Sequence, residues 1–245
     1  MEQRLHKIIA NRGYCSRRRA EELIVKGAVK VNGVIIRELG KCFDENCKIE
    51  IFNKIVDKKS ENIYILFYKP RSVITTMFDP KSRKTVNDFF KSFHERIYPV
   101  GRLDYDVEGL LLMTNDGEFA QFISHPSYQI KKTYQALCEG RVRKDQVKNL
   151  SRGVKIHDNY LAKALDVKIK NYDDSKNESI ISLTICEGKK HHVKEMLKNV
   201  DIVLKKLKRS AIEFLTDDGL KPGQYRSLKV HEVKQLYGIY KSIKK

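Results

Sequence analysis

The stretch Tyr98–Gly117, YPVGRLDYDVEGLLLMTNDG, is the most informative part of this chain. It places Arg102–Asp104 directly after a glycine and shortly before the apolar run Leu110–Met113. The apolar run predicts a buried anchor for the loop, so a carboxylate in that loop stays in a fixed place beside a cationic neighbour. Asp106 and Glu108 are further carboxylates in the same loop region, so the tripeptide carboxylate Asp104 has two nearby alternatives. This pattern indicates a loop with a fixed carboxylate next to a buried strand.

Apolar patterns around this stretch predict an α+β fold with a mainly antiparallel sheet and flanking helices. Residues 63–68 form a continuous apolar run that stops before Pro70, which is typical of a buried strand. The alternation of Ile181, Leu183 and Ile185 with polar residues predicts a half-buried strand. The other predicted elements are strands at 131–139, 161–170 and 225–230, and helices after Thr85, from Asp116 or Gly117, and over 193–198.

The N-terminal part predicts a separate small module. Ser16 fits the N-cap of a helix over 17–26, and Gly27 fits the left-handed residue that follows its end. Asn32-Gly33 between valines is the strongest short hairpin signal. Residues 53–62 are polar and lack apolar periodicity, so they predict a linker. We therefore expect two domains, residues 1–58 and 63–245.

The charge of the chain narrows the class of partner. Its 245 residues include 49 lysines and arginines against 31 aspartates and glutamates, a formal net charge of +18. Such a surplus attracts a polyanion, most commonly nucleic acid; a solubilising basic surface is the alternative. No apolar segment approaches the roughly 20 residues that span a bilayer. The N-terminus has no signal-peptide core. These features favour a cytoplasmic protein that does not bind membranes.

The cysteines and histidines give little indication of a metal site. Five cysteines without CxxC spacing are typical of free thiols in a cytosolic protein. Cys186, His191 and His192 are near one another but lack the paired spacing of zinc ligands. The chain also has no phosphate-binding loop. We therefore expect neither a metal nor an organic cofactor.

The string YPVGRLDYDVEGLLLMTNDG closely resembles the catalytic motif of the ribosomal-RNA pseudouridine synthases of the RsuA/RluB type. The resemblance implies that Asp104 is the catalytic nucleophile, that Leu103 is a buried residue of the pocket, and that Arg102 shapes the loop and contacts charge on the RNA. Isomerising uridine breaks the C1′–N1 bond and forms a C1′–C5 bond. The base must therefore be extruded, turned and reattached inside an enclosed pocket.

Two further segments resemble the same family. In YQIKKTYQALCEG the family has a lysine and a tyrosine at the places of Lys132 and Tyr134. The tyrosine packs against the flipped base and is a candidate proton-abstracting base. In EGKKHHVKEM, Lys194 stands where the family has the basic residue that pairs with the catalytic aspartate. A cation there keeps the aspartate ionised near neutral pH. Lys132, Lys190 and His192 are expected RNA contacts.

The C-terminal string LKKLKRSAIEFLTDDGLKPGQYRSL is also similar to the family. It implies that Leu207 forms part of the pocket wall and that Arg209 contacts a phosphate. The chain departs from the family pattern at His192, where glutamine or glutamate is usual, and at Glu195, where a basic residue is common. It departs again at Glu213, where glycine is frequent.

The string SRRRAEELIVKGAVKVNG resembles the RNA-binding domain named after small-subunit ribosomal protein four. The resemblance implies that Arg17, Arg18, Arg19 and Lys30 contact RNA phosphates. The arginines add charge to a helix N-terminus, which itself favours phosphate. A solvated basic face is the alternative.

The sequence thus predicts a stand-alone, monomeric ribosomal-RNA pseudouridine synthase that acts on ribosomal RNA or on an assembling ribosomal particle. The string RKTVNDFFKSFHERIYPVGRLDYD looks closer to members that act on large-subunit RNA, and the target uridine is open. A non-catalytic RNA-binding factor for ribosome assembly fits the charge and the first module equally well. Another RNA-modifying enzyme, such as a methyltransferase, is disfavoured by the missing glycine-rich cofactor loop.

Overall fold

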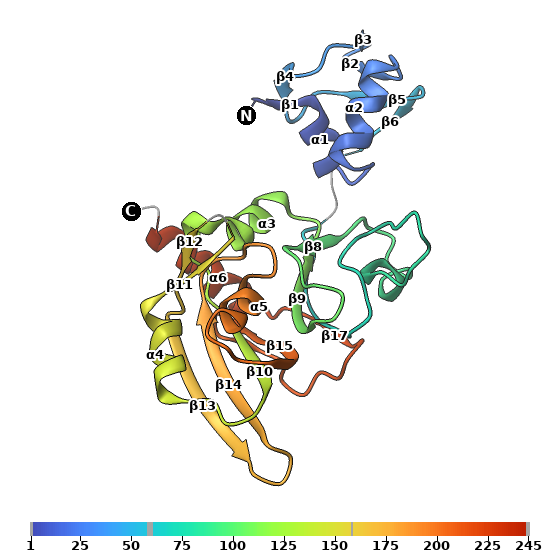
Figure 1. Ribbon diagram of the computed structural model, residues 1–245. Helices are drawn as coiled ribbons and strands as arrows, with labels where there is room; N and C mark the ends of the chain where they lie inside the picture. Colours follow the sequence, from blue (N-terminus) through green and yellow to red (C-terminus); the bar gives the residue numbers. More distant parts are fainter. Residues whose placement is uncertain (1, 58–60, 158, 244–245) are drawn as a thin grey trace. The chain divides into compact units, whose positions relative to one another are not determined.

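The computed structural model describes residues 2–57, 61–157 and 159–243, which form two compact units (Figure 1). The first contains Met1–Ile63 with the short segments Lys91–Tyr98 and Thr114–Gly117. The second contains Tyr64–Phe90, Pro99–Met113 and Glu118–Lys245. Within the described part of the chain, no helix is long and apolar enough to cross a bilayer.

The first unit packs two helices against short antiparallel strands. Ser16 Oγ accepts a hydrogen bond from Arg19 N at 3.2 Å, and Gly27 has φ +71°. Asn32 and Gly33 both have positive φ, as a tight hairpin requires. The predicted helix and hairpin are therefore confirmed. The elements are β1 (Glu2–Arg4), α1 (Leu5–Asn11), α2 (Arg17–Val25), β2 (Val29–Val31), β3 (Val34–Ile36), β4 (Cys42–Asp44), β5 (Ile49–Ile51) and β6 (Lys54–Ile55).

The segment predicted as a linker is partly structured. Lys54–Ile55 forms β6, which pairs with β5, and Val56 is buried in the core of the first unit. Polar composition concealed this strand because it is only two residues long and both residues are exposed. Residues 58–60, also in the expected linker, lie outside the described residues.

The second unit is built on one mixed sheet with the strand order β13-β14-β10-β15-β9-β7-β17, with β8 added to β9 and β16 to β15. The pairings of β13 with β14, β14 with β10, β10 with β15, β15 with β16 and β7 with β17 are antiparallel, and that of β15 with β9 is parallel. This mainly antiparallel sheet confirms the expected α+β class. Its strands are β7 (Tyr64–Lys69), β8 (Tyr98–Val100), β9 (Glu108–Thr114), β10 (Lys132–Glu139), β13 (Asp166–Asp173), β14 (Glu178–Ile185), β15 (Leu204–Ile212), β16 (Leu215–Thr216) and β17 (Tyr225–Ser227). A separate hairpin joins β11 (Val154–Ile156) to β12 (Tyr160–Ala162).

Helices α3 and α6 pack against this sheet. An apolar cluster buries Phe119 and Phe122 of α3 and Leu236 of α6 with sheet residues such as Leu110. The helical elements are two 3-10 turns (Val86–Phe89 and Pro126–Tyr128) and α3 (Gly117–Ser124), α4 (Lys144–Arg152), α5 (His192–Lys198) and α6 (Val230–Ile243).

The register of the central strands brings distant motifs together. Tyr134 on β10 pairs with Arg209 on β15, and Arg209 pairs with Gly109 on the parallel strand β9. A Cβ on Gly109 would lie 2.2 Å from the backbone oxygen of Arg209. Only glycine permits this close approach, which fixes Arg209 beside the start of β9.

Several elements differ from the sequence prediction. The strand expected at 161–170 is divided into β12 and β13, because Ala164 turns inward and its N–H bonds to Leu150 O. The strand expected at 225–230 ends at Ser227, and the helix expected after Thr85 is a single 3-10 turn. Helix α4 was missed because its apolar face is short, with only Gln146 and Leu150 buried.

Glu213 occupies the tight turn between β15 and β16 with φ +50°, a conformation that favours glycine. Its carboxylate accepts a hydrogen bond from Lys131 N at 2.5 Å, and its own N–H donates to Lys131 O at 2.9 Å. These two bonds to the start of β10 explain how glutamate is accommodated at this position.

Candidate active site

The loop that carries Asp104 is tied to the loop that follows β7. Thr75 Oγ1 donates to Leu103 O at 2.6 Å and accepts from Leu103 N at 3.2 Å. Ser72 N donates to Tyr105 O at 2.7 Å. Leu103 is buried, so its side chain anchors the loop while the neighbouring carboxylate stays accessible. Asp104 is therefore held in place from both sides.

Two basic side chains from the α5 segment meet Asp104. His191 Nδ1 lies 2.8 Å from Asp104 Oδ2, and Lys194 Nζ lies 3.1 Å from the same oxygen. Lys194 Nζ also lies 2.6 Å from Asp106 Oδ1. His191 adopts a left-handed conformation (φ +52°, ψ +24°) immediately before the helix. This conformation turns the imidazole towards the carboxylate, one helical turn before the lysine.

These contacts set the ionisation of Asp104. Burial raises the pKa of the carboxyl, but the hydrogen bonds from His191 and Lys194 outweigh burial and leave the pKa below its ordinary value. Burial lowers the pKa of Lys194, but its bonds to Asp106 and Asp104 leave it above the ordinary lysine value. At neutral pH the pair is therefore a carboxylate and an ammonium ion.

A buried lysine, Lys69, lies near the loop that carries Asp104 and Asp106. Lys69, with 0% of its surface exposed, donates to Pro70 O and Val73 O at 2.8 Å each. Burial lowers its pKa to about 8, although the nearby charges of Asp104 and Asp106 oppose the shift. Lys69 was not expected from the sequence; its place before Pro70, at the end of a continuous apolar strand, was the available signal.

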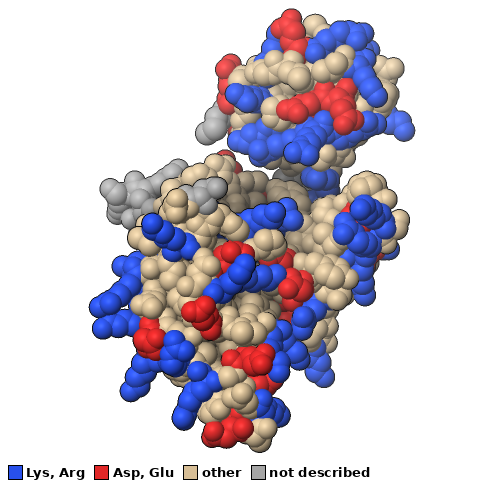
Figure 2. Space-filling model, viewed as in Figure 1, with Lys and Arg blue, Asp and Glu red and all other residues tan. Residues whose placement is uncertain are grey.

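Asp104 lines a cleft of about 1130 Å³. Tyr134 and Arg209 line the same cleft, and its basic side chains are Arg102, Lys132, Lys163, Lys189, Lys190 and Arg209. Lysine and arginine side chains are also spread over the viewed face of the molecule, with acidic side chains among them (Figure 2). The cleft combines an ionised carboxylate, an aromatic ring and a surplus of cations.

Tyr134 and Arg209 are both largely buried, with 8% and 3% of their surfaces exposed. The hydroxyl of Tyr134 has no hydrogen-bond partner among the described residues. Arg209 Nε donates to Leu110 O at 2.6 Å, while Nη2 is buried and has no partner in the described part of the chain. A phenol and a guanidinium thus reach the cleft with hydrogen-bonding capacity unused, which is how a site for a polar ligand is prepared.

Lys132 lies at the edge of the same cleft. Its Nζ donates to Ile130 O at 3.1 Å. Burial, followed by the charge of Arg209, lowers its pKa to about 8. An anion beside this side chain would favour its charged form and oppose the effect of burial.

One of the expected RNA contacts is buried. His192 has only 4% of its surface exposed, and burial lowers its pKa. Its Nδ1 accepts a hydrogen bond from Lys189 N at 3.3 Å. That bond helps to hold the turn before α5, while Nε2 is buried and has no partner in the described part of the chain.

The other expected site residues fall into two groups. Leu103, Leu207, Tyr134 and Lys194 line a small hollow next to Asp104, which places both leucines at the pocket. Arg17, Arg18 and Arg19 are exposed on α2 of the first unit, and Lys30 on β2 donates to Asn53 Oδ1 at 3.0 Å. Glu195 lies on α5, and nothing in the structure explains why it replaces a basic residue.

Several residues of the cleft were not expected from the sequence. His191 was considered only as a weak metal candidate, yet it contacts Asp104 directly. Lys189 lies 4.3 Å from the centre of the Tyr160 ring, whose hydroxyl bonds to Glu187, and all three residues line the cleft. The basic string before α5 was the signal for Lys189. In the described residues, no group of three or more His, Cys, Asp or Glu is placed to hold a metal ion.

An α+β fold whose cleft combines a fixed carboxylate, a tyrosine and several cations is suited to chemistry on a polyanionic substrate. This chain belongs to the RNA pseudouridylate synthase family, whose model matches residues 63–199; the S4 domain model matches residues 3–41. Family membership and the intact site favour the catalytic interpretation over a non-catalytic assembly factor. The chain is thus an RNA pseudouridine synthase with an N-terminal S4 domain.

Relatives match over almost the whole length. The chain is 47% identical to ribosomal large subunit pseudouridine synthase B of Bacillus subtilis (strain 168), over 96% of this chain and 95% of that one. It is 41% identical to an uncharacterized RNA pseudouridine synthase of Aquifex aeolicus (strain VF5), over 97% and 94%. A crystal structure of a pseudouridylate synthase matches with a TM-score of 0.67 and 28% identity, over 95% of this chain and 99% of that one.

Proposed function

We propose that this enzyme isomerises a uridine of ribosomal RNA to pseudouridine, and that large-subunit RNA is its substrate. The observation that carries this proposal is the contact of Asp104 with Lys194 and His191 in a basic cleft that also contains Tyr134. The Bacillus subtilis relative, whose name specifies the large ribosomal subunit, supports the choice of substrate. The enzyme works without a metal or organic cofactor, as a monomer in the cytoplasm.

Each catalytic residue has a distinct task in this proposal. Asp104 is the nucleophile that forms a bond to the nucleotide when the C1′–N1 bond breaks, and Lys194 keeps it ionised. The detached uracil turns on the ring of Tyr134 until C5 faces C1′. The C1′–C5 bond forms as the bond between Asp104 and the nucleotide breaks, which returns the carboxylate. Tyr134 takes the proton that C5 loses, and N1 gains a proton, so the product is an isomer of the substrate. The enclosed cleft keeps the base from escaping during these steps.

Binding of the RNA is proposed for both units. Arg102, Lys132, Lys190 and Arg209 contact phosphates around the extruded nucleotide. The S4 domain, proposed as residues 1–58, contributes Arg17, Arg18, Arg19 and Lys30, and the catalytic domain is proposed as residues 63–245. Phosphate contacts of this kind position the RNA without reading its sequence.

The proposed substrate is tested by mapping pseudouridine in ribosomal RNA. Carbodiimide modification followed by primer extension on RNA from cells with and without the protein would locate the missing pseudouridine. We expect one or a few stops in large-subunit RNA to disappear in the deletion strain and to return with the intact gene. Loss of a stop only in small-subunit RNA would contradict the substrate, and unchanged stops in both RNAs would contradict the proposed function.

Tyr134→Phe is expected to lower the single-turnover rate at least about tenfold, because it keeps the ring but removes the proton-handling hydroxyl. Tyr160→Phe is the matched control, since the Tyr160 hydroxyl in the same cleft is already bonded to Glu187. Tritium release from uridine labelled at C5 measures the rate. Equal activity of Tyr134→Phe and the parent would reduce Tyr134 to a stacking residue.

Replacing Arg17 and Arg18 together by glutamine is expected to weaken RNA binding and to flatten its dependence on salt. Two lost phosphate contacts should reduce the slope of log affinity against log salt by about 1.5 units. A suitable control is Lys148→Gln/Lys170→Gln, which removes the same charge from exposed positions outside the cleft. Equal slopes for the two double variants would remove the proposed RNA contact of α2.

A further inference from the structure

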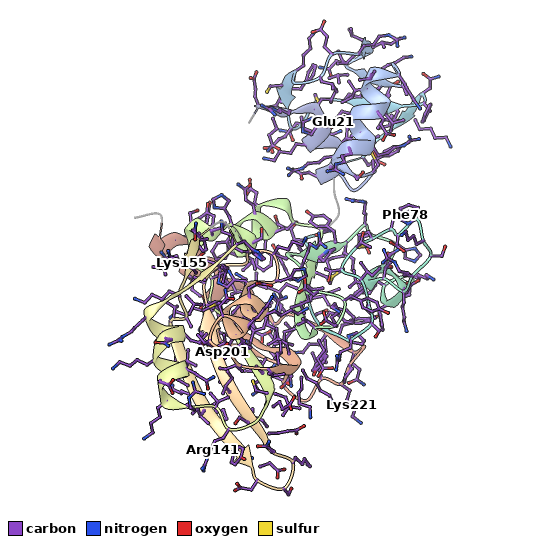
Figure 3. The ribbon with its side chains drawn as sticks, in the orientation of Figure 1. Glu21, Phe78, Arg141, Lys155, Asp201 and Lys221 are labelled. Carbon is purple, nitrogen blue, oxygen red and sulfur yellow. The ribbon has the colours of Figure 1, made fainter. Side chains whose placement is uncertain are left out.

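A second groove, of about 570 Å³, lies next to the active site. Residues of α5, of the turn that follows α5 and of the beginning of β15 line it. Arg71, from the loop after β7, lines it as well. Asp201, labelled in Figure 3, lies in that turn. Lys194 and Leu207 line both this groove and the hollow around Asp104. We call it the α5–β15 groove; it adjoins the active site through Lys194 and Leu207.

The groove carries cations that have no partner. Among the described residues, Arg71, Lys198 and Lys206 form no ion pair and no side-chain hydrogen bond, and all three are exposed. In contrast, Lys205 of the same groove is paired with Glu178 at 2.6 Å. Of the two acidic residues that line the groove, Asp106 already neutralises Lys194. The remaining positive charge in a concave surface attracts an anion that can contact several sites at once.

The floor of the groove is apolar. Ile202 and Leu207 are buried there, and Val203 has 58% of its surface exposed. A free phosphate ion or the outer face of a duplex would use only the cations of this surface. Single-stranded RNA offers both phosphates and the apolar faces of unpaired bases and riboses, so it matches the cations and the floor together.

We propose that the α5–β15 groove binds the single-stranded RNA adjacent to the target uridine, with its phosphates on Arg71, Lys198 and Lys206. This inference rests on the proposed function, because it assigns a path to the same substrate. One strand then passes the Lys194–Asp106 ion pair, and the nucleotide next to the groove enters the cleft at Asp104. Binding of the flanking strand holds the backbone still while the base turns.

The test uses the full-length protein with Lys198→Gln and Lys206→Gln combined. The control is again Lys148→Gln/Lys170→Gln, which lowers the net charge equally. Neither groove lysine contacts Asp104, so the catalytic ion pair stays intact. Fluorescence anisotropy with a labelled oligouridine of about ten nucleotides, within the site sizes of such grooves, measures affinity across a potassium chloride series. Two lost contacts to a single strand should reduce the salt slope by about 1.4 units more than in the control.

A reaction assay then separates the groove from the chemistry. With saturating ribosomal RNA the double variant is expected to keep the parent's single-turnover rate, while the RNA concentration for half-maximal rate rises several-fold. Equal salt slopes in the groove and control variants would overturn the proposal. Loss of binding to polyglutamate with unchanged binding to oligouridine would also overturn it, because the groove would then fit an acidic protein. Because binding is measured without turnover, a parent enzyme that is inactive on ribosomal RNA would contradict the proposed function alone.

Discussion

Asp104→Asn is expected to reduce pseudouridine formation at least about a thousandfold, as removal of a nucleophile does in other enzymes, while RNA affinity stays close to that of the parent. The amide keeps the size of the side chain and can still bond to His191, but it cannot attack the nucleotide. The fold should survive, because Lys194 retains its second partner Asp106 at 2.6 Å and is not left as an unpaired charge.

The control for this prediction is Asp106→Asn. It makes the same chemical change two residues away, on the other carboxylate that contacts Lys194. We expect this variant to keep most of the parent activity, because the Asp106 carboxylate lies in the α5–β15 groove and does not line the cleft. Tritium release and filter binding, measured side by side, distinguish chemistry from affinity. If the two variants lose activity equally, Asp104 has no special role and the assignment of the nucleophile is wrong.

The sequence predicted the parts of the site that lie in continuous motifs. The loop of Asp104 follows from a charged tripeptide next to an apolar run, and the buried strand Tyr64–Lys69 follows from its composition. Tyr134 and Lys194 were expected because their segments resemble family motifs. What the sequence could not supply was the sheet register that places Tyr134 opposite Arg209, since strand pairing depends on long-range contacts.

The misses have physical causes of the same kind. His191 was considered only as a weak metal candidate, because its contact with Asp104 depends on a positive φ that a sequence pattern does not reveal. His192 was expected to face RNA from its place in a basic string, but the turn buries it. Helix α4 has little apolar periodicity because buried Gln146 donates to two backbone carbonyls, which a hydrophobic pattern does not register.

Lys194→Ala is expected to lower the single-turnover rate at neutral pH at least about tenfold, because a preorganised charge next to the reacting group is lost. It should also change the pH profile. In the parent, the bonds from His191 and Lys194 hold the pKa of Asp104 below its ordinary value, so the carboxylate persists into acid. Without Lys194, the hydrogen bond and the charge that oppose burial most directly besides those of His191 are lost, and the pKa of Asp104 should rise. The acid limb of the pH–rate profile should therefore move to higher pH.

Two further variants define what the pair of donors contributes. Lys194→Arg keeps a cation and should leave the acid limb near its position in the parent. His191→Asn keeps a hydrogen-bond donor and tolerates the left-handed backbone of this position, so it removes the imidazole without adding strain. We expect His191→Asn to shift the acid limb less than Lys194→Ala, because Lys194 remains a full cation across this pH range. A Lys194→Ala enzyme with the parent's rate and an unmoved acid limb would show that Asp104 stays ionised without the lysine, and that the ion pair only positions α5.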